Sequence, residues 1–497
     1  MMFEILCFTF IVVLISWVYT DNFKSKRPPG PLRLPLIGTI LQLGVDKRRP
    51  QYETFRSISK KYGPISSIEL GLYPGVIFDD FETIKKLLNH ELWVDRFFNS
   101  LFAERSFGKA LGIIFISGDT WKEMRRFTIR TLRDFGYGKK SMESVLEDEV
   151  KDLVAKIDGL CEENGSIVAM KQVFSMPVLN VLWHLVCSTS SEDDKRLKEL
   201  LVLVDTLARA TPMAGGILMP FPFLRHIFSD MTGNSHVRKC NMELQEYFRD
   251  VLRRRREEGV YKNDQRDYID VFLQEIDHHR EKGSTPNYYT DEQFISTTID
   301  LFEAGAETTN NTLEFGIYYM LQNPEIQAKV QDEIDLVVGK NRLPTFADKA
   351  EMPYTEAVLT EIQRISNVVA MTVRCPTEDV WVDGYFIAKG TIGFMNLFSV
   401  HMDKNFWGDP EKFRPERFLD SDKKLIPNKL QRVIPFGAGR RVCLGEILAR
   451  ATLFTYFATV LQHFTFQKCD GDSDAQKPAM IGFTLTPAPY SAKVIKR

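Results

Sequence analysis

Cysteine is scarce and scattered in this chain: seven of the 497 residues are cysteine, and no two of them form a C-x-x-C pair. This pattern excludes a disulfide framework and a zinc site built on paired cysteines, and it favours a reducing compartment in which a functional cysteine works as a thiolate. An excess of charge of one sign is also lacking, since the formal net charge is -2. The balanced charge gives no reason to expect nucleic acid as a partner.

Internal repeats and low-complexity stretches are absent as well. Length alone decides little, because 497 residues can form two or three average domains or one large catalytic domain. The hydrophobic fraction of 44% and the 36 phenylalanines are enough to bury a large core and to line an apolar cavity.

One uncharged apolar run stands out at residues 5–20, ending with the interfacial residues Trp17 and Tyr19 and followed by a basic cluster at 24–27. Sixteen residues of helix reach about 24 Å, which crosses a hydrocarbon core of roughly 30 Å with local thinning and snorkelling. A cleaved signal peptide is the competing interpretation, but the run has neither a basic start nor a small-x-small cleavage site. We therefore expect an uncleaved single-pass anchor over residues 1–23, with the remaining chain on the cytosolic side.

A basic, proline-rich segment over residues 24–36 predicts a stiff hinge after the anchor, and residues 37–497 are expected to form the catalytic domain. Apolar residues at three- and four-residue spacing predict helices around 145–157, 196–208, 240–256, 291–322, 325–338 and 443–464. Shorter alternating stretches predict strands at 64–78, at 380–392 and at the C-terminal end. The expected fold class is mainly α with small β-sheets.

The stretch 215–224 is unusually apolar for a segment punctuated by glycine and proline. It is either a buried loop or a second membrane-touching surface near a substrate entrance. The sequence favours neither interpretation over the other.

The strongest local signal surrounds Cys443, in the stretch 435–445 that reads PFGAGRRVCLG. Two glycines ahead of the cysteine allow a tight turn next to a flat ligand, and Gly445 lets the following helix approach it. A helix N-terminus and two adjacent arginines favour the thiolate form, which could ligate a metal or attack an electrophile. A buried structural cysteine is the competing interpretation, but such a residue rarely has glycines and arginines clustered around it.

The string F-x-x-G-x-R-x-C-x-G, complete from Phe436 to Gly445, resembles the haem-binding signature of the cytochrome P450 superfamily. The resemblance covers nearly the whole chain and points to the animal microsomal members, which include drug- and insect-hormone-metabolising enzymes. It implies a single large helix-rich cytochrome P450 fold after a membrane anchor helix, in the endoplasmic reticulum membrane, with haem b (iron protoporphyrin IX) as cofactor. Cys443 is then the axial thiolate, Arg441 pairs with a haem propionate, Phe436 packs near the sulfur and Gly445 contacts the cofactor.

Two further motifs occur upstream, in the order the family shows. Glu361 and Arg364 form an E-x-x-R pair, and residues 415–418 read PERF. An E-x-x-R pair alone is usually a solvated surface pair. In the family, the pair forms a buried structural network with the arginine of the later motif.

Small residues at Ala304 and Gly305 open a shallow groove on the predicted helix 291–322, beside the acid Glu307 and the alcohol Thr308. By itself this pattern is typical of a close helix–helix contact. It also resembles the family's oxygen-binding element, A-G-x-E-T-T, which implies that Ala304 and Gly305 lie against the cofactor and make room for O₂. Thr308 would then hydrogen-bond the distal oxygen or an ordered water, and Glu307 would pass protons inward.

Trp121 and Arg125 resemble the family's W-x-x-x-R element, which implies that both side chains reach one haem propionate. Many relatives carry His-Arg after the E-x-x-R helix, whereas this chain has Val373-Arg374, so the second propionate contact is assigned to Arg374. A basic stripe continues after the W-x-x-x-R element at Arg126, Arg130 and Arg133. The stripe is either a solvated face or a docking surface for an acidic electron donor.

The resemblance implies a monooxygenase that inserts one atom of O₂ into a lipophilic substrate, by hydroxylation or epoxidation. Electrons are expected from NADPH through NADPH–cytochrome P450 reductase, with cytochrome b5 as a second candidate partner. Alternatives are a same-fold haem enzyme that isomerises or dehydrates without external electrons, a non-catalytic haem-binding protein, and a cysteine hydrolase, although no histidine lies in a recognisable hydrolase motif. Apolar residues lining the substrate pocket are expected near 97–117, 205–224, 294–304, 366–374 and 481–485.

Overall fold

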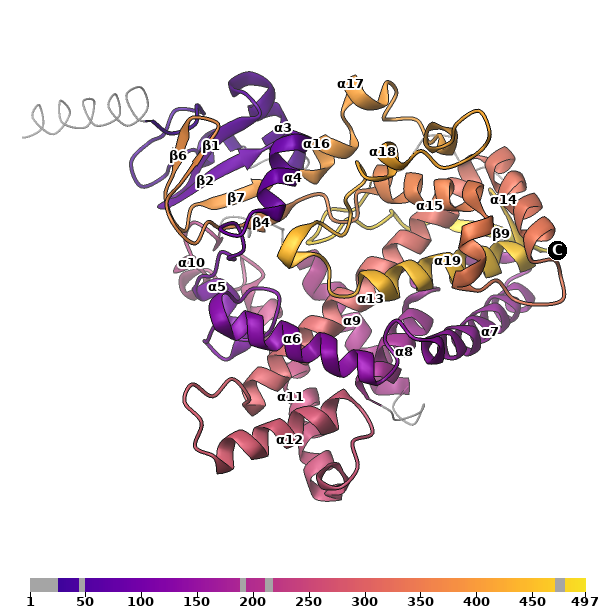
Figure 1. Ribbon diagram of the computed structural model, residues 1–497, viewed down its shortest axis with the longest axis horizontal. Helices are drawn as coiled ribbons and strands as arrows, with labels where there is room; N and C mark the ends of the chain where they lie inside the picture. Colours follow the sequence, from indigo (N-terminus) through magenta and orange to yellow (C-terminus); the bar gives the residue numbers. More distant parts are fainter. Residues whose placement is uncertain (1–25, 44–49, 188–193, 211–217, 470–478) are drawn as a thin grey trace, which may run out of the picture.

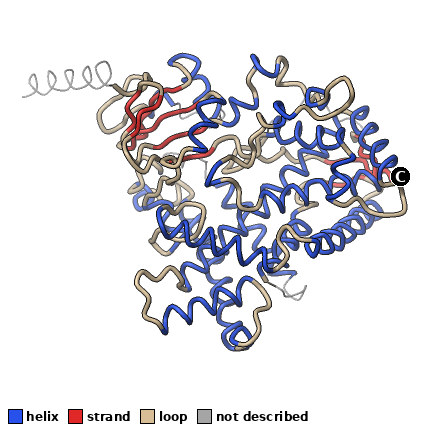
Figure 2. The backbone as a smooth tube through the Cα atoms, viewed as in Figure 1, coloured by secondary structure: helices blue, strands red, loops and turns tan. Residues whose placement is uncertain are grey.

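The computed structural model describes residues 26–43, 50–187, 194–210, 218–469 and 479–497. Helices dominate this part of the molecule, and the strands gather mainly at one end, with a smaller group near the C-terminus (Figures 1 and 2). The predicted fold class, mainly α with small β-sheets, is confirmed.

The described elements follow the chain in this order. The α-helices are α2 (Ile40–Leu43), α3 (Gln51–Tyr62), α4 (Phe81–Asn89), α5 (Ser100–Ala103), α6 (Gly118–Asp134), α7 (Lys140–Glu163), α8 (Ser175–Val186), α9 (Asp194–Ala210), α10 (Leu224–Ile227), α11 (Asn234–Glu258), α12 (Tyr268–Glu281), α13 (Asp291–Gln322), α14 (Pro324–Val337), α15 (Pro353–Ser366), α16 (Leu397–His401), α17 (Lys404–Trp407), α18 (Pro427–Leu430) and α19 (Glu446–His463). The 3₁₀ helices are η1 (Glu104–Ser106), η3 (Val260–Lys262), η4 (Phe346–Glu351), η5 (Pro415–Phe418) and η6 (Gly439–Arg441). The strands are β1 (Ile65–Leu70), β2 (Tyr73–Phe78), β3 (Ile167–Ala169), β4 (Thr372–Arg374), β5 (Val380–Val382), β6 (Tyr385–Ile387), β7 (Ile392–Met395), β8 (Phe464–Gln467) and β9 (Ser491–Lys496).

The largest described sheet has the strand order β1-β2-β7-β4. Strands β1 and β2 form an antiparallel hairpin with Ile65 opposite Phe78, and β2 runs parallel to β7. The proline-rich segment lies on β1, where the Ser67 N–H donates to the carbonyl of Pro29 at 2.8 Å and its hydroxyl donates to that of Pro28 at 2.6 Å. The segment after the predicted anchor is therefore attached to the sheet.

Helix α13 runs through the centre of the fold and contacts helices of both halves of the core. Its first turn is capped by Thr290, whose side chain accepts a hydrogen bond from the Gln293 N–H at 3.1 Å, and acidic residues in that turn complement the helix dipole. The N-terminal half packs against α8 and α11, and the C-terminal half against α14, α15 and α19. The two largest hydrophobic clusters both include α13 residues, so the middle of this helix lies where the two halves of the core meet.

The E-x-x-R motif forms the buried network that the resemblance implied. Arg364 donates to both carboxylate oxygens of Glu361, at 2.7 and 2.8 Å, and Arg417 of η5 donates to the same carboxylate at 3.1 Å. Both guanidinium groups also donate to backbone carbonyls and lie against the ring of Trp407. The network joins α15 to η5, and its charges are almost completely shielded from solvent.

The predicted helices and strands are found, with differences at their ends. The helix predicted over 291–322 is α13 with the same bounds, whereas the two stretches predicted as strands at 64–78 and 380–392 each contain a hairpin. The helix predicted from residue 443 begins only at Glu446, because residues 443–445 continue the loop after η6.

No described helix combines the length and apolarity needed to cross a bilayer. The anchor predicted over residues 1–23 lies outside the described residues. The apolar stretch 215–224 is described only from residue 218 onward, where Met219 is buried and Phe223 is exposed.

We expect Glu361→Ala to destabilise the fold by about 3–5 kcal/mol, because it leaves the buried guanidinium of Arg364 without a carboxylate and that of Arg417 with only Asp409. The yield of folded protein and the midpoint of urea unfolding measure this effect. The matched control is Glu147→Ala, which breaks an exposed pair with Lys151 and should leave both quantities unchanged. Similar behaviour of the two variants would show that the buried network does not stabilise the fold.

Candidate active site

A cavity of about 460 Å³ lies beside the middle of α13. Its wall is mainly apolar, and each of the five stretches predicted to face a pocket contributes to it, for example through Phe115, Leu207, Leu301, Val368 and Phe483. This volume is typical of a small-molecule site. The cavity also contains the sulfur of Cys443 and several charged groups, which determine its chemistry.

The loop that carries Cys443 is held by backbone geometry. The Cys443 N–H donates to the carbonyl of Phe436 at 2.9 Å, and the Tyr137 hydroxyl donates to the carbonyl of Leu444 at 2.5 Å. Gly439 has a positive φ of 69°, and a methyl group there would lie 2.0 Å from the carbonyl oxygen of Leu88. Only glycine fits at this position, so the tight turn predicted before the cysteine is confirmed.

Phe436 and Gly445 stand at the two ends of this loop in the sequence, and both line the cavity. A methyl group on Gly445 would meet no protein atom within 4 Å, so its small size leaves cavity space beside the cysteine and does not serve a contact within the protein. The ring of Phe436 lines the cavity and is covered by the guanidinium of Arg450 at 4.7 Å.

The side chain of Cys443 is exposed to the cavity, although protein surrounds the loop. Burial raises the pKa of its thiol, and this effect exceeds the opposing effects of the Gly445 N–H and of Arg125. The prediction that the local sequence favours the thiolate is therefore wrong for the polypeptide alone, because α19 begins later and the carboxylate of Glu446 also raises the pKa. A metal cation deprotonates a coordinating thiol outright, so ionisation of this cysteine depends on a bound metal.

Four arginines on the cavity wall form no ion pair with any carboxylate of the described residues: Arg96, Arg125, Arg374 and Arg441. Arg441 donates to the carbonyls of Val94 and Ile116, both at 2.7 Å, and its guanidinium stacks on the ring of Trp121 at 3.6 Å. The predicted W-x-x-x-R pair therefore belongs to this group, but its indole lies against an arginine.

The other three arginines are fixed by the backbone around them. Arg125 donates to the carbonyl of Val442 at 2.7 Å, which ties α6 to the cysteine loop. Arg374 and Arg96 both donate to the carbonyl of Val373. The buried Nε atoms of Arg96 and Arg374 have no hydrogen-bond partner among the described residues.

The positive charge of these arginines is not neutralised by an ion pair within the described residues. Burial and the neighbouring guanidinium groups lower the pKa of Arg441 to about 8, although Asp95 opposes this, and burial lowers that of Arg96 to about 10. Arginine normally stays protonated in proteins, so such shifts mark a group that requires an anion. The two carboxylates of haem would supply that anion and the Cys443 sulfur would supply an iron ligand, so the residues present fit this cofactor.

The small residues of α13 have separate roles. Ala304 is exposed to the cavity, whereas a methyl group on Gly305 would lie 2.6 Å from a methyl carbon of Leu182 on α8. Gly305 therefore serves the close helix–helix contact that was the competing interpretation of this motif. Ala304 provides the open surface.

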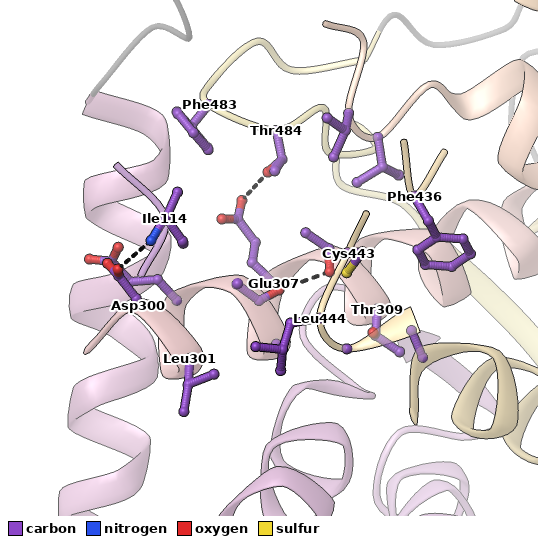
Figure 3. Close-up of a pocket in the computed structure, with 18 of the residues that line it drawn as sticks. Ile114, Asp300, Leu301, Glu307, Thr309, Phe436, Cys443, Leu444, Phe483 and Thr484 are labelled. Atoms are coloured by element: carbon purple, nitrogen blue, oxygen red, sulfur yellow. Dashed lines mark hydrogen bonds between the residues drawn. The ribbon is translucent and has the colours of Figure 1, made fainter. Parts of the chain in front are cut away.

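The acid and the alcohol of α13 both line the cavity. Glu307 accepts a hydrogen bond from the Thr484 hydroxyl at 2.6 Å and one from Asn311 at 3.4 Å (Figure 3). The hydroxyl of Thr308 donates to the carbonyl of Ala304 at 2.9 Å. Burial raises the pKa of Glu307 to about 7, so this carboxyl can hold or release a proton near neutral pH.

A family model described as Cytochrome P450 matches residues 28–494. The chain belongs to the cytochrome P450 family. It is 34% identical to the farnesoate epoxidase of Bombyx mori over 93% of this chain and 91% of that protein. It is also 34% identical to cytochrome P450 2J5 of Mus musculus and 33% identical to cytochrome P450 18a1 of Drosophila melanogaster, each over 98% of this chain and over 96% and 90% of those proteins.

The predicted family is thus confirmed, and its animal microsomal members are among the relatives. This P450 is an oxidoreductase with a haem iron cofactor and is a haem-thiolate monooxygenase. Its relatives imply a redox partner and a lipophilic substrate.

Sequence reasoning missed several residues in or near the cavity of this P450. The sequence contained a clue to Arg96, because this residue places a charge inside the largely apolar stretch 92–98. Thr484 falls in the predicted lining stretch 481–485 and Asn311 lies one turn after Glu307, but the contact between them depends on folding across 173 residues of chain. Glu314, two turns beyond Glu307, is also buried; it accepts hydrogen bonds from the Gln172 N–H at 2.5 Å and from Asn310 at 3.0 Å.

We expect Glu314→Gln to stabilise the protein above pH 7. Burial raises the pKa of Glu314 from 4.5 to about 7, so the wild type loses stability as the pH rises between these values. Glutamine can accept the same two hydrogen bonds without becoming charged. The free energy of unfolding in urea should be about 3 kcal/mol higher in the variant at pH 8, and the difference should close near pH 4.5. An equal or lower stability of the variant at pH 8 would contradict this prediction.

Proposed function

We propose that this P450 binds haem b, that Cys443 would supply the thiolate that holds its iron, and that the enzyme inserts one oxygen atom of O₂ into a lipophilic substrate, by hydroxylation or epoxidation. The observation that carries the proposal is that one cavity holds the Cys443 sulfur, four unpaired arginines, and the acid–alcohol pair of Glu307 and Thr308. An enzyme that isomerises or dehydrates without external electrons has no need of that pair. Residues 1–23, 24–36 and 37–497 are proposed as anchor, hinge and catalytic domain.

In holding the cofactor, the polypeptide would bind the haem propionates with one group of residues and contact the ring and the iron with another. Haem b, when bound, supplies the iron chemistry that activates O₂ with two electrons. Arg125, Arg374 and Arg441, together with Trp121, would bind the propionates, and Arg96 would add a donor beside Arg374. Ala304, Phe436 and Gly445 would lie against the ring, Gly305 would let α13 pack closely on α8 beside it, and a Cys443 thiolate would donate electron density to the iron.

Proton delivery is proposed for α13. Glu307, with its pKa near 7, would exchange protons with water, and Thr484 and Asn311 would hold its carboxyl in place. Thr308 would present its hydroxyl at the cavity surface, where it exchanges the bond to the Ala304 carbonyl for one to an incoming oxygen or water.

Electrons are proposed to come from NADPH through NADPH–cytochrome P450 reductase, with cytochrome b5 as a second donor. The basic stripe of Arg126, Arg130 and Arg133 is exposed on α6, the helix that Arg125 ties to the cysteine loop. An acidic partner docked there would be close to the sulfur side of the cofactor.

Attachment to the endoplasmic reticulum membrane, with the catalytic domain cytosolic, is proposed from the uncharged N-terminal run. Large apolar side chains are exposed on the N-terminal segment, on the β1–β2 turn and around α10, including Leu36, Leu41, Leu72, Phe223, Ile227 and Met231. The turn and the segment before α10 adjoin, since a methyl group on Gly71 would lie 3.1 Å from Pro220. Such a patch fits the boundary of a bilayer and supports the membrane interpretation of residues 215–224.

The substrate is proposed to be an apolar molecule of steroid, terpenoid, fatty-acid or xenobiotic type. The cavity wall is mainly hydrophobic, and the name of the silkworm relative states that it epoxidises farnesoate. Product analysis after incubation with reductase and a lipid panel identifies the compound.

Cys443→Ala tests the proposed function at the ligand. The variant should lose the long-wavelength band of the reduced, CO-bound haem that a thiolate ligand produces, because alanine cannot coordinate iron. Cys375→Ala is the control, since that buried cysteine lies outside the cavity wall and should leave the band in place. Retention of the band without Cys443 would assign the ligand to another residue.

Thr308→Ala should preserve the haem spectrum while diverting electrons from product to hydrogen peroxide, because the route for protons is interrupted. The ratio of product to NADPH consumed should fall by about a hundredfold, the lower end of the usual contribution of a proton-transfer group. The control is Thr298→Ala on the same helix, whose hydroxyl makes the same type of backbone bond outside the cavity wall. An unchanged ratio in Thr308→Ala would remove this residue from the route.

A further inference from the structure

A charged group interrupts the apolar wall of the cavity where α13 faces η1. Arg105 donates through Nη1 to Asp300 and through Nη2 to Glu303. The other oxygen of Asp300 accepts the N–H groups of Ile113 and Ile114, at 2.6 and 2.8 Å (Figure 3). Asp300 is completely buried, and its carboxylate accepts hydrogen bonds from three donors. Glu303, in contrast, lines the cavity.

Glu303 leaves one carboxylate oxygen for a ligand. Its Oε2 accepts from Arg105, and Oε1 receives no hydrogen bond from the described residues. Its side chain keeps 23% of its surface exposed on the cavity side. Burial raises the pKa of Glu303 although Arg105 opposes the rise, as expected for a carboxylate that has lost water without gaining a full set of donors.

The group carries one excess negative charge, because two carboxylates share one guanidinium. An anionic ligand in the cavity would be repelled by this charge and would have to displace Glu303 to reach Arg105. A hydrogen-bond donor would be attracted and would replace the hydration that Oε1 has lost.

We propose that Glu303 determines the substrate class: the cavity selects lipophilic molecules that carry a hydroxyl or a protonated amine and discriminates against the corresponding carboxylates. This inference rests on the proposed monooxygenase function and deepens it. Glu303 is a specificity-determining residue here and takes no part in the oxidation itself.

The position of Glu303 also fixes where such a substrate is oxidised. Thr308 lies five positions further along α13, which corresponds to about 7.5 Å along the helix axis. A donor held at Glu303 therefore places the adjacent carbon away from the oxygen-activating end of the cavity. The oxidised position should be remote from the hydroxyl or amine.

Because Arg105 stays in place without Glu303, the proposal can be tested by asking whether a variant without Glu303 gains affinity for carboxylates. Asp300 and the two N–H groups hold the guanidinium in place without Glu303. In Glu303→Ala the pair that remains is neutral, and Nη2 of Arg105 faces the cavity without a partner. The variant should then accept the carboxylates that the wild type discriminates against.

Equilibrium binding to the haem-loaded enzyme tests this with three probes of one chain length: 1-dodecanol, its methyl ether and dodecanoate. The wild type should bind the alcohol about tenfold more tightly than the ether or the acid, as a charge-assisted hydrogen bond allows. Glu303→Ala should lose the preference for the alcohol and bind dodecanoate about tenfold more tightly than the wild type does. The control Glu292→Gln, which removes a carboxylate of α13 paired with Lys109, should retain the wild-type order.

Equal wild-type affinities for alcohol and acid, or an unchanged order in Glu303→Ala, would overturn the inference. If Glu303→Ala does not fold, Glu303→Gln provides the same test, since it removes the charge at similar size and should bind dodecanoate more tightly than the wild type. The CO-difference spectrum, recorded first, separates the two proposals. Its absence in the wild type contradicts the proposed function, whereas its presence with an unchanged order contradicts only the role of Glu303.

Discussion

Buried positive charge that forms no ion pair within the described residues is the constraint on which the rest of this structure depends. Four arginines from separate segments meet beside the Cys443 sulfur, and backbone carbonyls hold them in place without neutralising them. Burying charge in this way is costly unless an anion compensates it. The fold is therefore organised around an anionic, metal-bearing ligand, and in our proposal the same ligand makes the buried thiol a thiolate.

The contrast with the Glu361 network shows that the unpaired charge is specific to the cavity. There, Arg364 and Arg417 share the carboxylate of Glu361 and Arg417 also pairs with Asp409, so two carboxylates balance the two positive charges. That network stabilises the body of the protein, while the unpaired arginines prepare a site. Helix α13 connects the two regions, because its C-terminal half packs on α15 and its middle lines the cavity.

Much of this was predictable from sequence because periodicity and contiguous motifs are local. The bounds of α13 and the tight turn before Cys443 followed from short patterns, and the buried role of Glu361 followed from the family resemblance. Contacts between distant segments did not, so the meeting of Arg96 with Arg374 and the bond from Thr484 to Glu307 emerged only from the fold. The thiol pKa was predicted with the wrong sign, since sequence shows neighbouring charges but not the burial that outweighs them.

The most direct test of this central claim is the affinity of haem-depleted protein for haem and for haem dimethyl ester, whose propionates carry no charge. If the arginine group binds the propionates, the ester should bind at least about tenfold more weakly, in line with the value of hydrogen bonds to charged groups. Equal affinities for the two compounds would show that the buried guanidinium groups serve another purpose.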